Sequence, residues 1–591
     1  MRNEKIRNIA IIAHVDHGKT TLVDALLKQA GVFRDGEETK DRLLDSMALE
    51  RERGITITAK NCSLNWKGKK INILDTPGHA DFGGEVERAL SMVDGAILLV
   101  DAAEGPLPQT RFVVQKALER GLSMIVCINK IDRQDARIKE VLDEIYSLFI
   151  DLGASEEQIE FPVLFTVGRD GTATQDLSVK GKDLSPLFET IIECVQAPSY
   201  DEGKHFQMLV ANISYSEFLG RLAIGKVAHG TARAGNELIL IDENNNRNAL
   251  KVVKLQSYQD IKIVETKVAE PGDIILLSGI DEVTIGDTIC SLEVKEALPR
   301  IYVEPPTVAM SFSTNTSPFS GRDGKFIQAQ KIYERLVRET LYNVSIQVEK
   351  TNMPDTFLVK ARGELQLVVL IETMRREGYE LSVGRPVVLY KYENEKKLEP
   401  IEHVVVDCED EYTGVITSKL SSRKGILVNM HNYGKRTRLE FSVPSRSLIG
   451  FRDTFLTDTK GTGLMSSYLE GYEEYRGDSV SRENGSLVAD REGIAVAYAI
   501  FHLEPRGKMF IVPGETFYKG MVIGERVKSG DLEVNPSKAK KLTNLRAAGK
   551  DENVILTPVQ PMTIEKAIDF ITNDELVEIT PKAIRIRKKD L

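Results

Sequence analysis

The residues with the clearest chemical potential lie near the amino terminus, in the segment Ala13–Thr20. A β-branched apolar run, Ile9–Ile12, precedes it and indicates a buried parallel strand, and a helix-compatible run, Thr21–Leu27, follows it. Backbone N–H groups of such a loop can bind phosphates, Lys19 can reach the β- and γ-oxygens, and the Thr20 hydroxyl can hold Mg²⁺. We therefore predict a phosphate-binding loop, whose nucleotide contacts come from Asp16, His17, Gly18, Lys19, Thr20 and Thr21.

Two further segments have the chemistry of a γ-phosphate sensor. Asp75 follows the apolar run Ile71–Leu74, so its carboxylate ends a strand and can hold Mg²⁺ through water. The N–H of Gly78, three residues later, can contact a γ-phosphate. Gly54–Ile57 lies between the loop and Asp75 in a polar, arginine-rich stretch that suits a switch segment. Together they predict a site that responds to the state of the nucleotide.

A fourth segment could select the base. Asn129, Lys130 and Asp132 follow the apolar run Met124–Ile128. A carboxylate at this place can accept hydrogen bonds from both guanine N1–H and the guanine amino group, a pairing that adenine does not offer. Each tetrapeptide alone is weak, and Asn129–Asp132 could be an ordinary turn. Four segments in this order, three of them at strand ends, predict a GTP-binding domain.

The first 200 residues alternate between strand and helix patterns, which predicts a doubly wound α/β sheet. We expect strands near 8–13, 71–75, 95–101, 123–128 and 161–166, with helices near 85–92 and 109–120. All the motifs then fall at the carboxyl ends of strands, where such sheets bind nucleotides. The predicted domain covers residues 1–200.

The rest of the chain predicts four further domains. Residues 201–299 have short strands separated by Gly, Asn and Asp, which favours a small antiparallel β-barrel. Residues 300–392 and 393–478 each favour a split βαβ (ferredoxin-like) module. The expected helices are Lys325–Tyr342, Glu364–Arg376, 411–422 and 445–457, with a strand at Thr356–Ala361. Residues 479–591 match neither pattern, and we expect short strands around 495–503 and 508–512.

Two C-terminal segments are basic. The first, 535–550, is polar at its start and ends on glycine, which predicts an exposed loop, and the second is Arg585–Lys589. Such charge runs are either solvated surface or contacts to RNA phosphates, which need Lys and Arg but no base-specific geometry. Within the loop, the candidate RNA-binding residues are Lys538, Lys540, Lys541, Arg546 and Lys550.

Composition indicates a large cytoplasmic protein. The chain has 591 residues, with 78 basic and 88 acidic side chains and a net charge of −10, so nucleic acid must be bound by local patches. The 5 cysteines lack metal-ligand spacing, and we expect reduced thiols that are mostly buried. We see no secretory signal and no apolar run of the roughly 20 residues that a membrane helix needs. We expect a cytoplasmic monomer without membrane contact.

The motifs resemble those of the translational GTPase superfamily, which includes the elongation factors. The barrel followed by two split βαβ modules resembles elongation factor G and LepA, but the tRNA-mimicking domain of elongation factor G has no counterpart here. Four segments resemble the BipA family, also called TypA, namely Asp81–Arg88, Asn315–Phe319, Pro444–Arg452 and Lys540–Ala547. The resemblance covers essentially the whole chain, and 479–591 corresponds to the family-specific C-terminal domain.

The resemblance implies a ribosome-dependent GTPase that acts in assembly of the large ribosomal subunit and in translation under cold or other stress. Its implied partners are GTP or GDP, the ribosome, ribosomal RNA and, through the C-terminal domain, tRNA. The implied catalytic residues are Lys19, Thr56 and His79, with His79 orienting water, and the implied Mg²⁺ ligands are Thr20, Thr56 and Asp75. Val15 and Ile55 match an apolar gate beside the histidine, and Asp16 matches a position that can hold a monovalent cation such as K⁺.

The sequence departs from the family pattern in places, and other functions stay open. Ala13 replaces the first loop glycine, a trait shared with elongation factor G. Thr166 and Val167 stand where relatives have Ser-Ala beside the guanine, a contact made mostly by backbone. No arginine finger is identifiable, so stimulation is expected from the ribosome. The alternatives are an elongation-factor-type GTPase that acts on tRNA movement and an rRNA-binding assembly scaffold with vestigial hydrolysis.

Overall fold

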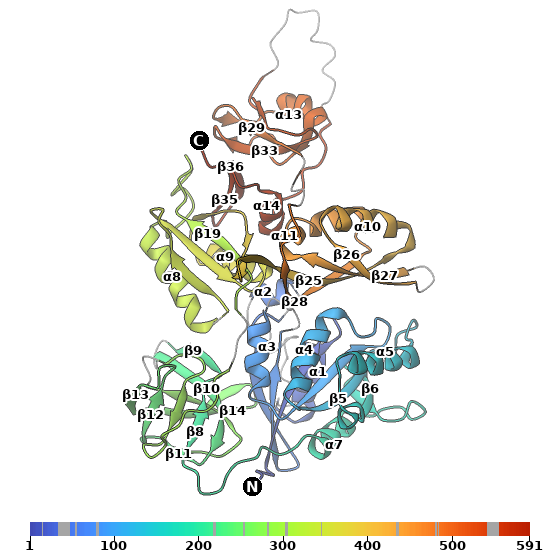
Figure 1. Cartoon of the computed structure of the whole chain (residues 1–591), viewed down its shortest axis with the longest axis vertical. Helices are drawn as coiled ribbons and strands as arrows, with labels where there is room; N and C mark the ends of the chain where they lie inside the picture. The colour runs from blue at the N-terminus through green and yellow to red at the C-terminus, as the bar shows by residue number, and fades with distance from the viewer. Residues whose placement is uncertain are drawn as a thin grey trace, which may run out of the picture. The chain divides into compact units, whose positions relative to one another are not determined.

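In the computed structural model, the amino-terminal part of the chain forms a seven-stranded sheet in the order β2-β3-β1-β4-β5-β6-β7. Figure 1 draws this part of the chain in blue to teal. The strands from β3 to β6 run parallel, and the edge strands β2 and β7 are antiparallel to their neighbours. The strands are β1 (Ile6–Ala13), β2 (Lys60–Trp66), β3 (Lys69–Asp75), β4 (Gly95–Asp101), β5 (Ser123–Asn129), β6 (Val163–Val167) and β7 (Thr172–Thr174). The structure describes residues 1–14, 16–32, 48–53, 56–77, 82–216, 220–251, 254–279, 283–301, 305–343, 345–432, 436–478, 482, 484–539 and 555–590.

Helices cover both faces of this sheet, as the sequence predicts. One apolar core joins it to α1 (Lys19–Gln29) and α7 (Ser185–Cys194), and another joins it to α3 (Gly83–Leu90), α4 (Pro108–Glu119) and α5 (Ile138–Asp151). Every residue of β1 and β4 is buried, which explains their apolar runs Ile9–Ala13 and Ala96–Val100. The shorter helices are α2 (Ala48–Arg53) and α6 (Glu156–Ile159). Because β1, β3, β5 and β6 are parallel, the loops after them meet at one edge.

An antiparallel barrel follows, with its own apolar core. Its strands are β8 (Gln207–Leu209), β9 (Asn212–Ser216), β10 (Gly220–His229), β11 (Ala232–Arg233), β12 (Glu237–Ile241), β13 (Arg247–Lys251), β14 (Lys254–Gln259), β15 (Lys262–Glu265), β16 (Val268–Ala269), β17 (Ile274–Ser278) and β18 (Thr288–Cys290). Asn8 of β1 donates hydrogen bonds to Asp94 Oδ2 (2.8 Å) and to the carbonyl of Gly272 (2.9 Å), and Lys226 pairs with Asp94 at 2.5 Å. These bonds attach the barrel at the end of β1 opposite to its phosphate-binding loop. Sheet and barrel belong to one compact unit, which comprises Met1–Pro305 and Thr340–Ser345.

The second compact unit comprises the rest of the chain and begins with two split βαβ modules. In the first, the sheet order is β20-β21-β19-β22, and in the second β28 and β27 flank β25, with β26 beyond β27. The first contains β19 (Val308–Ser313), α8 (Ala329–Tyr342), β20 (Gln347–Lys350), β21 (Thr356–Ala361), α9 (Glu364–Arg376), β22 (Leu381–Val383) and β23 (Val387–Val388). The second contains β24 (Lys391–Glu393), β25 (Lys396–Glu409), α10 (Thr413–Ser422), β26 (Ile426–Asn432), β27 (Arg436–Pro444), α11 (Ser445–Leu448), α12 (Arg452–Asp458) and β28 (Leu464–Glu474).

The C-terminal segment extends the sheet of the first module. Its strand β35 pairs with β22, with Ile579 opposite Leu381, and the sheet continues through β36, β33 and β29 to β34. The elements are β29 (Ser486–Ala489), β30 (Gly493–Ile494), α13 (Ala497–Leu503), β31 (Gly507–Met509), β32 (Thr516–Phe517), β33 (Met521–Arg526), β34 (Leu532–Val534), α14 (Ile564–Phe570), β35 (Glu575–Ile579) and β36 (Ile584–Lys588). An 11-stranded sheet therefore includes strands from both ends of this unit.

Three predicted elements are wrong or shifted. The strand expected around 495–503 is helix α13, whose buried Ala499, Ile500 and Leu503 have helical spacing. The helix expected at 445–457 is divided into α11 and α12, because Gly450 between them has a φ of +72°. The helix expected from Lys325 begins at Ala329 instead.

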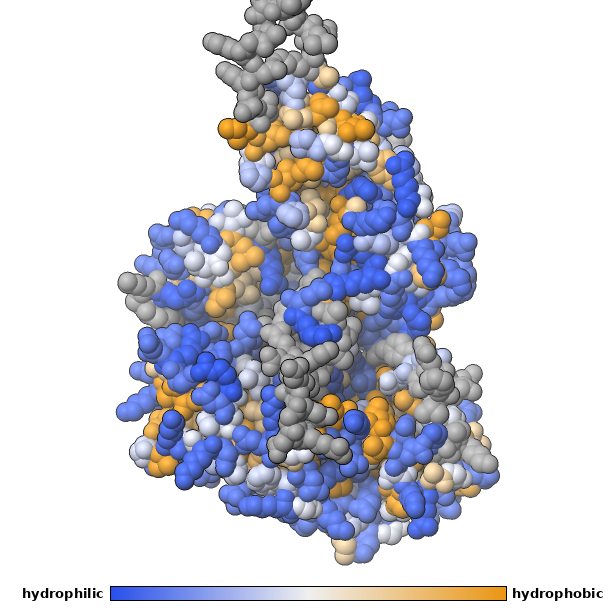
Figure 2. Space-filling view, turned by 180° about the vertical axis from the view of Figure 1, so that it is seen from behind, coloured by the Kyte–Doolittle hydropathy of each residue, from blue (hydrophilic) through white to orange (hydrophobic). Residues whose placement is uncertain are grey.

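The surface is largely hydrophilic on the face seen in Figure 2, with apolar groups scattered over it. In the described ranges, no helix combines the length and the apolar character that crossing a membrane requires. Cys62, Cys127, Cys290 and Cys408 are buried thiols, whereas Cys194 is exposed. Burial raises the pKa of Cys127 to about 12 and that of Cys290 to about 11, which keeps these thiols protonated and unreactive.

Candidate nucleotide-binding site

The loop between β1 and α1 has the backbone of a phosphate-binding loop. Gly18 is the residue before α1 and has a φ of +93°, a conformation that favours glycine. A Cβ atom on Gly18 would lie 2.5 Å from the side-chain nitrogen of Asn129. Ala13, which replaces the first loop glycine, ends β1 and is buried beside Leu99 of β4. Ala13 is therefore accommodated as an ordinary strand residue.

Three of the predicted motifs meet at the buried carboxylate of Asp75, at the end of β3. Lys19 Nζ lies 2.8 Å from Asp75 Oδ1 and also donates a hydrogen bond to the carbonyl of Thr76. Thr56 Oγ1 donates to Asp75 Oδ2 at 3.5 Å. Asp75 is 0% exposed, and Lys19 and Thr56 are buried too. The cluster concentrates an ammonium, a hydroxyl and a carboxylate, the groups needed to bind a phosphate together with a hard cation.

Asn129 links the phosphate-binding loop to the loop after β6. Its amide nitrogen donates to the carbonyl of His17 (2.8 Å), and its Oδ1 accepts from Gly168 N (2.9 Å) and Thr166 Oγ1 (3.1 Å). The side chain is 2% exposed, so these bonds are shielded from water. The sequence predicts Asn129 at a base-binding loop but does not reveal this positioning role.

Lys130 joins the phosphate-binding loop to the end of β4. It has a φ of +60°, and its Nζ donates to the carbonyl of Asp16 (2.6 Å) and pairs with Asp101 (2.8 Å). Burial disfavours the Asp101 carboxylate, but hydrogen bonds from Lys130 and the Ala103 N–H hold its pKa below the usual value. Asp101, at the end of β4, is therefore a site residue that the sequence motifs do not indicate. Its position at a strand end is the signal that could have found it.

The imidazole of His17 is fully buried and is engaged by the protein itself. Its Nδ1 accepts from the Asp101 N–H at 3.3 Å, and its Nε2 lies 3.4 Å from Glu104 Oε2. The hydrogen bond from His17 lowers the pKa of Glu104. The buried side chain therefore anchors the phosphate-binding loop to the segment Asp101–Glu104. Any contact of His17 with a nucleotide must be made by its backbone.

The other predicted residues differ in exposure. Asp132 is 41% exposed and lies 3.4 Å from the exposed Arg169. Asp16 and Thr21 are exposed, Thr20 and Val167 are half-buried, and Thr166 is buried. Gly78, His79, Val15 and Ile55 lie outside the described residues. Lys538 is exposed, and Lys540, Lys541, Arg546 and Lys550 also lie outside the described residues.

The second basic segment, Arg585–Lys589, is largely internal. Strand β36 carries Arg585, Arg587 and Lys588. Arg585 pairs with Glu578 at 3.1 Å, Lys588 lies within 2.9 Å of Glu575, and Arg587 is 2% exposed. These three side chains are engaged within the C-terminal sheet, whereas Lys589 is exposed, so most of the segment is not a solvated charge run.

Comparisons with known proteins agree with this arrangement. Residues 4–197 match the Elongation factor Tu GTP binding domain, residues 205–292 match Elongation factor G domain 2, and residues 396–483 match the Elongation factor G C-terminus. Residues 484–591 match the TypA/BipA C-terminal domain. A protein of Escherichia coli K12 named "Large ribosomal subunit assembly factor BipA" is 48% identical over 591 residues, which cover 100% of this chain and 97% of the relative. The chain belongs to the TypA/BipA family.

Other family members have similar coverage. The relative of the same name from Salmonella typhimurium is 48% identical over 591 residues, with 100% of this chain and 97% of the relative covered. The Haemophilus influenzae relative is 47% identical over 596 residues, with the same coverage. A crystal structure of a Thermus thermophilus protein shares the fold, with a TM-score of 0.54 at 17% identity over 80% of this chain and 98% of that chain. The predicted multidomain fold and the resemblance to the BipA family are confirmed.

Proposed function

We propose that this chain is a ribosome-associated GTPase that hydrolyses GTP to GDP and acts in assembly of the large ribosomal subunit. The cluster of Lys19, Thr56 and Asp75, within a domain of the elongation factor Tu GTP-binding type, carries the proposal. Because the Lys19 ammonium pairs with Asp75, a bound γ-phosphate would compete with that carboxylate for the same cation. Lys19 would then neutralise charge that develops between the β- and γ-phosphates.

The residues present fit a bound Mg²⁺. Carboxylate and hydroxyl oxygens are ligands that this hard cation prefers, and the hydroxyl of Thr56 already contacts the buried Asp75. Thr20 and Thr56 would hold the ion directly, and Asp75 would act through water. Bound Mg²⁺ would supply charge neutralisation at the β- and γ-phosphates. Asp16, exposed on the same loop, would hold a monovalent cation such as K⁺.

Water activation would come from residues outside the described ranges. We assign the orientation of the attacking water to His79 and a γ-phosphate contact to the N–H of Gly78. Val15 and Ile55 would form an apolar gate beside the histidine. We expect slow hydrolysis by the protein alone and stimulation when a ribosome positions His79.

Guanine selection would lie at the exposed carboxylate of Asp132, beside the loop that Asn129 and Lys130 fix. Thr166 and Val167 would add backbone contacts to the base. The Asp132→Asn change should shift preference from guanine to xanthine nucleotides, measured by competition with labelled GDP. Unchanged guanine selectivity would refute the base assignment.

The biological role is inferred from the relatives, whose names identify large ribosomal subunit assembly factors. We propose that the basic loop 535–550 contacts ribosomal RNA, with Lys538 exposed at its start. Contact with tRNA through the same domain, action as a cytoplasmic monomer and a role in cold or other stress belong to the same proposal.

A complementation experiment tests this role. A deletion strain grown in the cold would carry the wild-type chain or the His79→Ala variant, and large-subunit precursors would be measured on sucrose gradients. We expect the wild type alone to clear the precursors. Full rescue by His79→Ala would instead support an assembly scaffold in which hydrolysis is vestigial, and a normal precursor profile without the protein would argue against an assembly role.

A further inference from the structure

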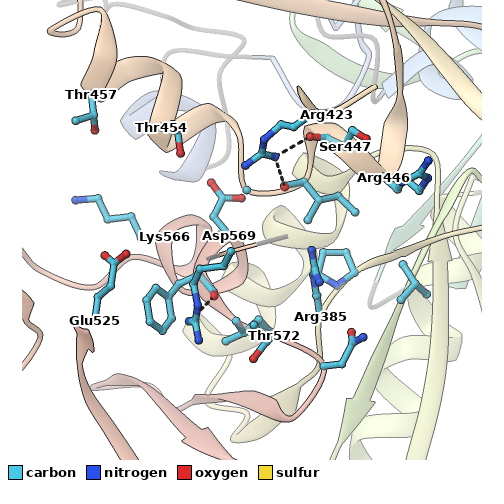
Figure 3. Close-up of a pocket in the computed structure, with 18 of the residues that line it drawn as sticks. Arg385, Arg423, Arg446, Ser447, Thr454, Thr457, Glu525, Lys566, Asp569 and Thr572 are labelled. Atoms are coloured by element: carbon cyan, nitrogen blue, oxygen red, sulfur yellow. Dashed lines mark hydrogen bonds between the residues drawn. The ribbon is translucent and has the colours of Figure 1, made fainter. Parts of the chain in front are cut away.

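The second unit contains a cavity of about 760 Å³ that none of the sequence motifs uses (Figure 3). Its walls come from the segment after β22, from α10 to α12 of the second module, and from α14 with the preceding C-terminal strands. The volume lies within the range of roughly 300–1,000 Å³ that is typical of small-molecule sites. The cavity is therefore large enough for a ligand of nucleotide size.

The walls carry an excess of positive charge. Seven Lys or Arg side chains and four Asp or Glu side chains line the cavity. Three of the acids already accept hydrogen bonds from other side chains, namely Asp458, Asp478 and Glu525. The fourth, Asp569, faces Arg423. Two wall cations pair with carboxylates behind the wall, Arg446 with Glu399 (2.5 Å) and Arg482 with Glu575 (3.3 Å). Arg385 and Arg423 make no ion pair with a carboxylate in the described part of the chain.

Two arginines show this excess most clearly, and Figure 3 places both beside the cavity. Arg385 makes no hydrogen bond or ion pair with any residue in the described part of the chain, and Arg423 donates to the carbonyls of Ser447 (2.7 Å) and Ile449 (3.3 Å). Burial together with the charge of Arg482 lowers the pKa of Arg385, and burial together with Arg385 lowers that of Arg423. Like charges held together out of water call for an anion.

Two buried polar atoms on the walls also lack partners. Ser447 Oγ and Arg482 Nε are buried and accept or donate no hydrogen bond among the residues described. The Arg482 guanidinium is held in place, since it donates to the carbonyl of Phe570 at 2.8 Å and lies 3.9 Å from the centre of its ring. A buried polar atom without a partner is costly in a folded protein, and a bound ion, water or ligand group can satisfy it.

We propose that this cavity binds the phosphate group of a nucleotide-sized ligand, at a site separate from the GTP site. Arg385 and Arg423 supply positive charge that no carboxylate pairs with, and Arg482, which also pairs with Glu575, supplies its free Nε–H. Their planar donor groups have the geometry that phosphate oxygens match best. The hydroxyl of Ser447 provides a further hydrogen bond. The phosphate belongs either to a free nucleotide or to a nucleotide within an RNA chain, since both present the same oxygens.

Calorimetric titration of the full chain, saturated with GDP and Mg²⁺ so that the first site is filled, tests the proposal. One arm uses adenosine 3′,5′-bisphosphate, and the other uses a single-stranded uridine hexanucleotide. Binding of the bisphosphate identifies a free nucleotide as the source, and binding of the RNA alone identifies a nucleotide within RNA. Because GDP occupies the GTP site, the result does not depend on the proposed GTPase activity.

The Arg385→Gln variant assigns the binding to this cavity. Its affinity should fall at least about tenfold, because charge-assisted hydrogen bonds to phosphate are lost. Its melting temperature without ligand should not fall, since Arg385 makes no hydrogen bond or ion pair within the described ranges. If this variant fails to fold, Lys508→Gln replaces it, because Lys508 is an exposed residue on the cavity wall.

The matched control is Arg338→Gln, on the exposed face of α8 in the same unit, which should bind like the wild type. Binding of neither probe, equal binding by Arg385→Gln and the wild type, or equal weakening by Arg385→Gln and Arg338→Gln would overturn the proposal.

Discussion

In the nucleotide site of the first unit, three of the predicted motifs include a terminal residue of the element that positions them. Asp75 ends β3, Asn129 ends β5, and Lys19 begins α1. In the second unit, the sheet is assembled from distant parts of the chain, since β22 pairs with β35 and Asn315 donates to Glu578 across 263 positions. The first arrangement lets a motif be found in the sequence, whereas the second becomes visible only in three dimensions.

The difference also concerns stability. The nucleotide loops are held at the edge of a sheet whose core does not depend on them. In the second unit, Glu578 is fully buried and accepts hydrogen bonds from Asn315 (3.1 Å), Tyr518 (2.7 Å) and Arg585 (3.1 Å). Changes in the loops should therefore alter ligand binding, and changes around Glu578 should alter folding.

The largest expected effect is that of Glu578→Ala. Removing one partner of a buried, hydrogen-bonded charge costs about 3–5 kcal/mol, so the second unit should unfold at a lower urea concentration. Circular dichroism reports on the whole chain, whereas the single tryptophan, Trp66, is stacked 4.3 Å from Phe188 in the first unit. We expect part of the dichroism transition to shift while the Trp66 fluorescence transition stays unchanged.

The control for this variant is Glu533→Ala on the exposed side of β34, which should change the free energy of unfolding by less than about 0.5 kcal/mol. If Glu578→Ala shifted the Trp66 transition as much as the dichroism, the two units would not unfold separately.

The next effect in size concerns Lys19→Ala. Loss of a charged group that stabilises the transition state typically reduces turnover by about 10²–10³-fold, so ribosome-stimulated GTP hydrolysis should fall by this order. Phosphate release from GTP measures it. Lys28→Ala, in the last turn of the same helix, removes an exposed lysine and should leave turnover unchanged. Equal activity of the two variants would contradict the role of Lys19.

A smaller effect is expected from Gly18→Ala. Gly18 and Gly31 both have a positive φ, a backbone conformation that costs an alanine residue about 1–2 kcal/mol. The two positions differ in their surroundings, because a Cβ atom would collide with the Asn129 side chain at Gly18 and would meet open space at Gly31. Gly18→Ala should weaken GDP binding by at least about tenfold, because Asn129 loses its bond to the loop. Fluorescent GDP titration measures this, and Gly31→Ala should bind like the wild type. Similar affinities for both variants would argue against the link through Asn129.

The smallest effect is expected at the C-terminal strand. Burial opposes ionisation of Asp574, but hydrogen bonds from Lys588 and Thr572 lower its pKa to about 2. A lowered carboxyl pKa stabilises the folded state above the ordinary value near 3.8, and this stabilisation is lost as the pH falls toward 2. Asp574→Asn should lower the free energy of unfolding at pH 7 by less than about 1 kcal/mol, because its carboxylate is 64% exposed.

Urea unfolding of both proteins between pH 7 and pH 2 measures this effect. The difference between them should vanish at the acid end, and a difference that is independent of pH would rule out the ionic contribution.

The parts of the fold that the sequence predicts well depend on local patterns. Helix Glu364–Arg376 and strand Thr356–Ala361 have the predicted bounds, because their apolar periodicity is uninterrupted. The sequence predicts a strand where the helix Ala497–Leu503 lies, because a short apolar run with few polar neighbours has no clear period. The bend at Gly450 depends on a backbone angle that composition alone does not determine.

The candidate site is predictable to a similar degree. Lys19 and Asp75 lie at the start of α1 and the end of β3 and contact each other, as loops at one edge of a parallel sheet lead one to expect, and Thr56 joins them from a segment outside any strand. The bonds of Asn129 to His17 and Gly168 could not be predicted, because they join residues that no local pattern relates. The role of the basic run Arg585–Lys589 is ambiguous from the sequence for the same reason, since its carboxylate partners Glu575 and Glu578 lie on the neighbouring strand β35.

The most direct test of the account is GTP turnover by the purified chain with and without ribosomes. We predict slow hydrolysis by the protein alone, strong stimulation by ribosomes, and loss of that stimulation in the His79→Ala variant. Equal turnover in the presence and absence of ribosomes would contradict the proposed function.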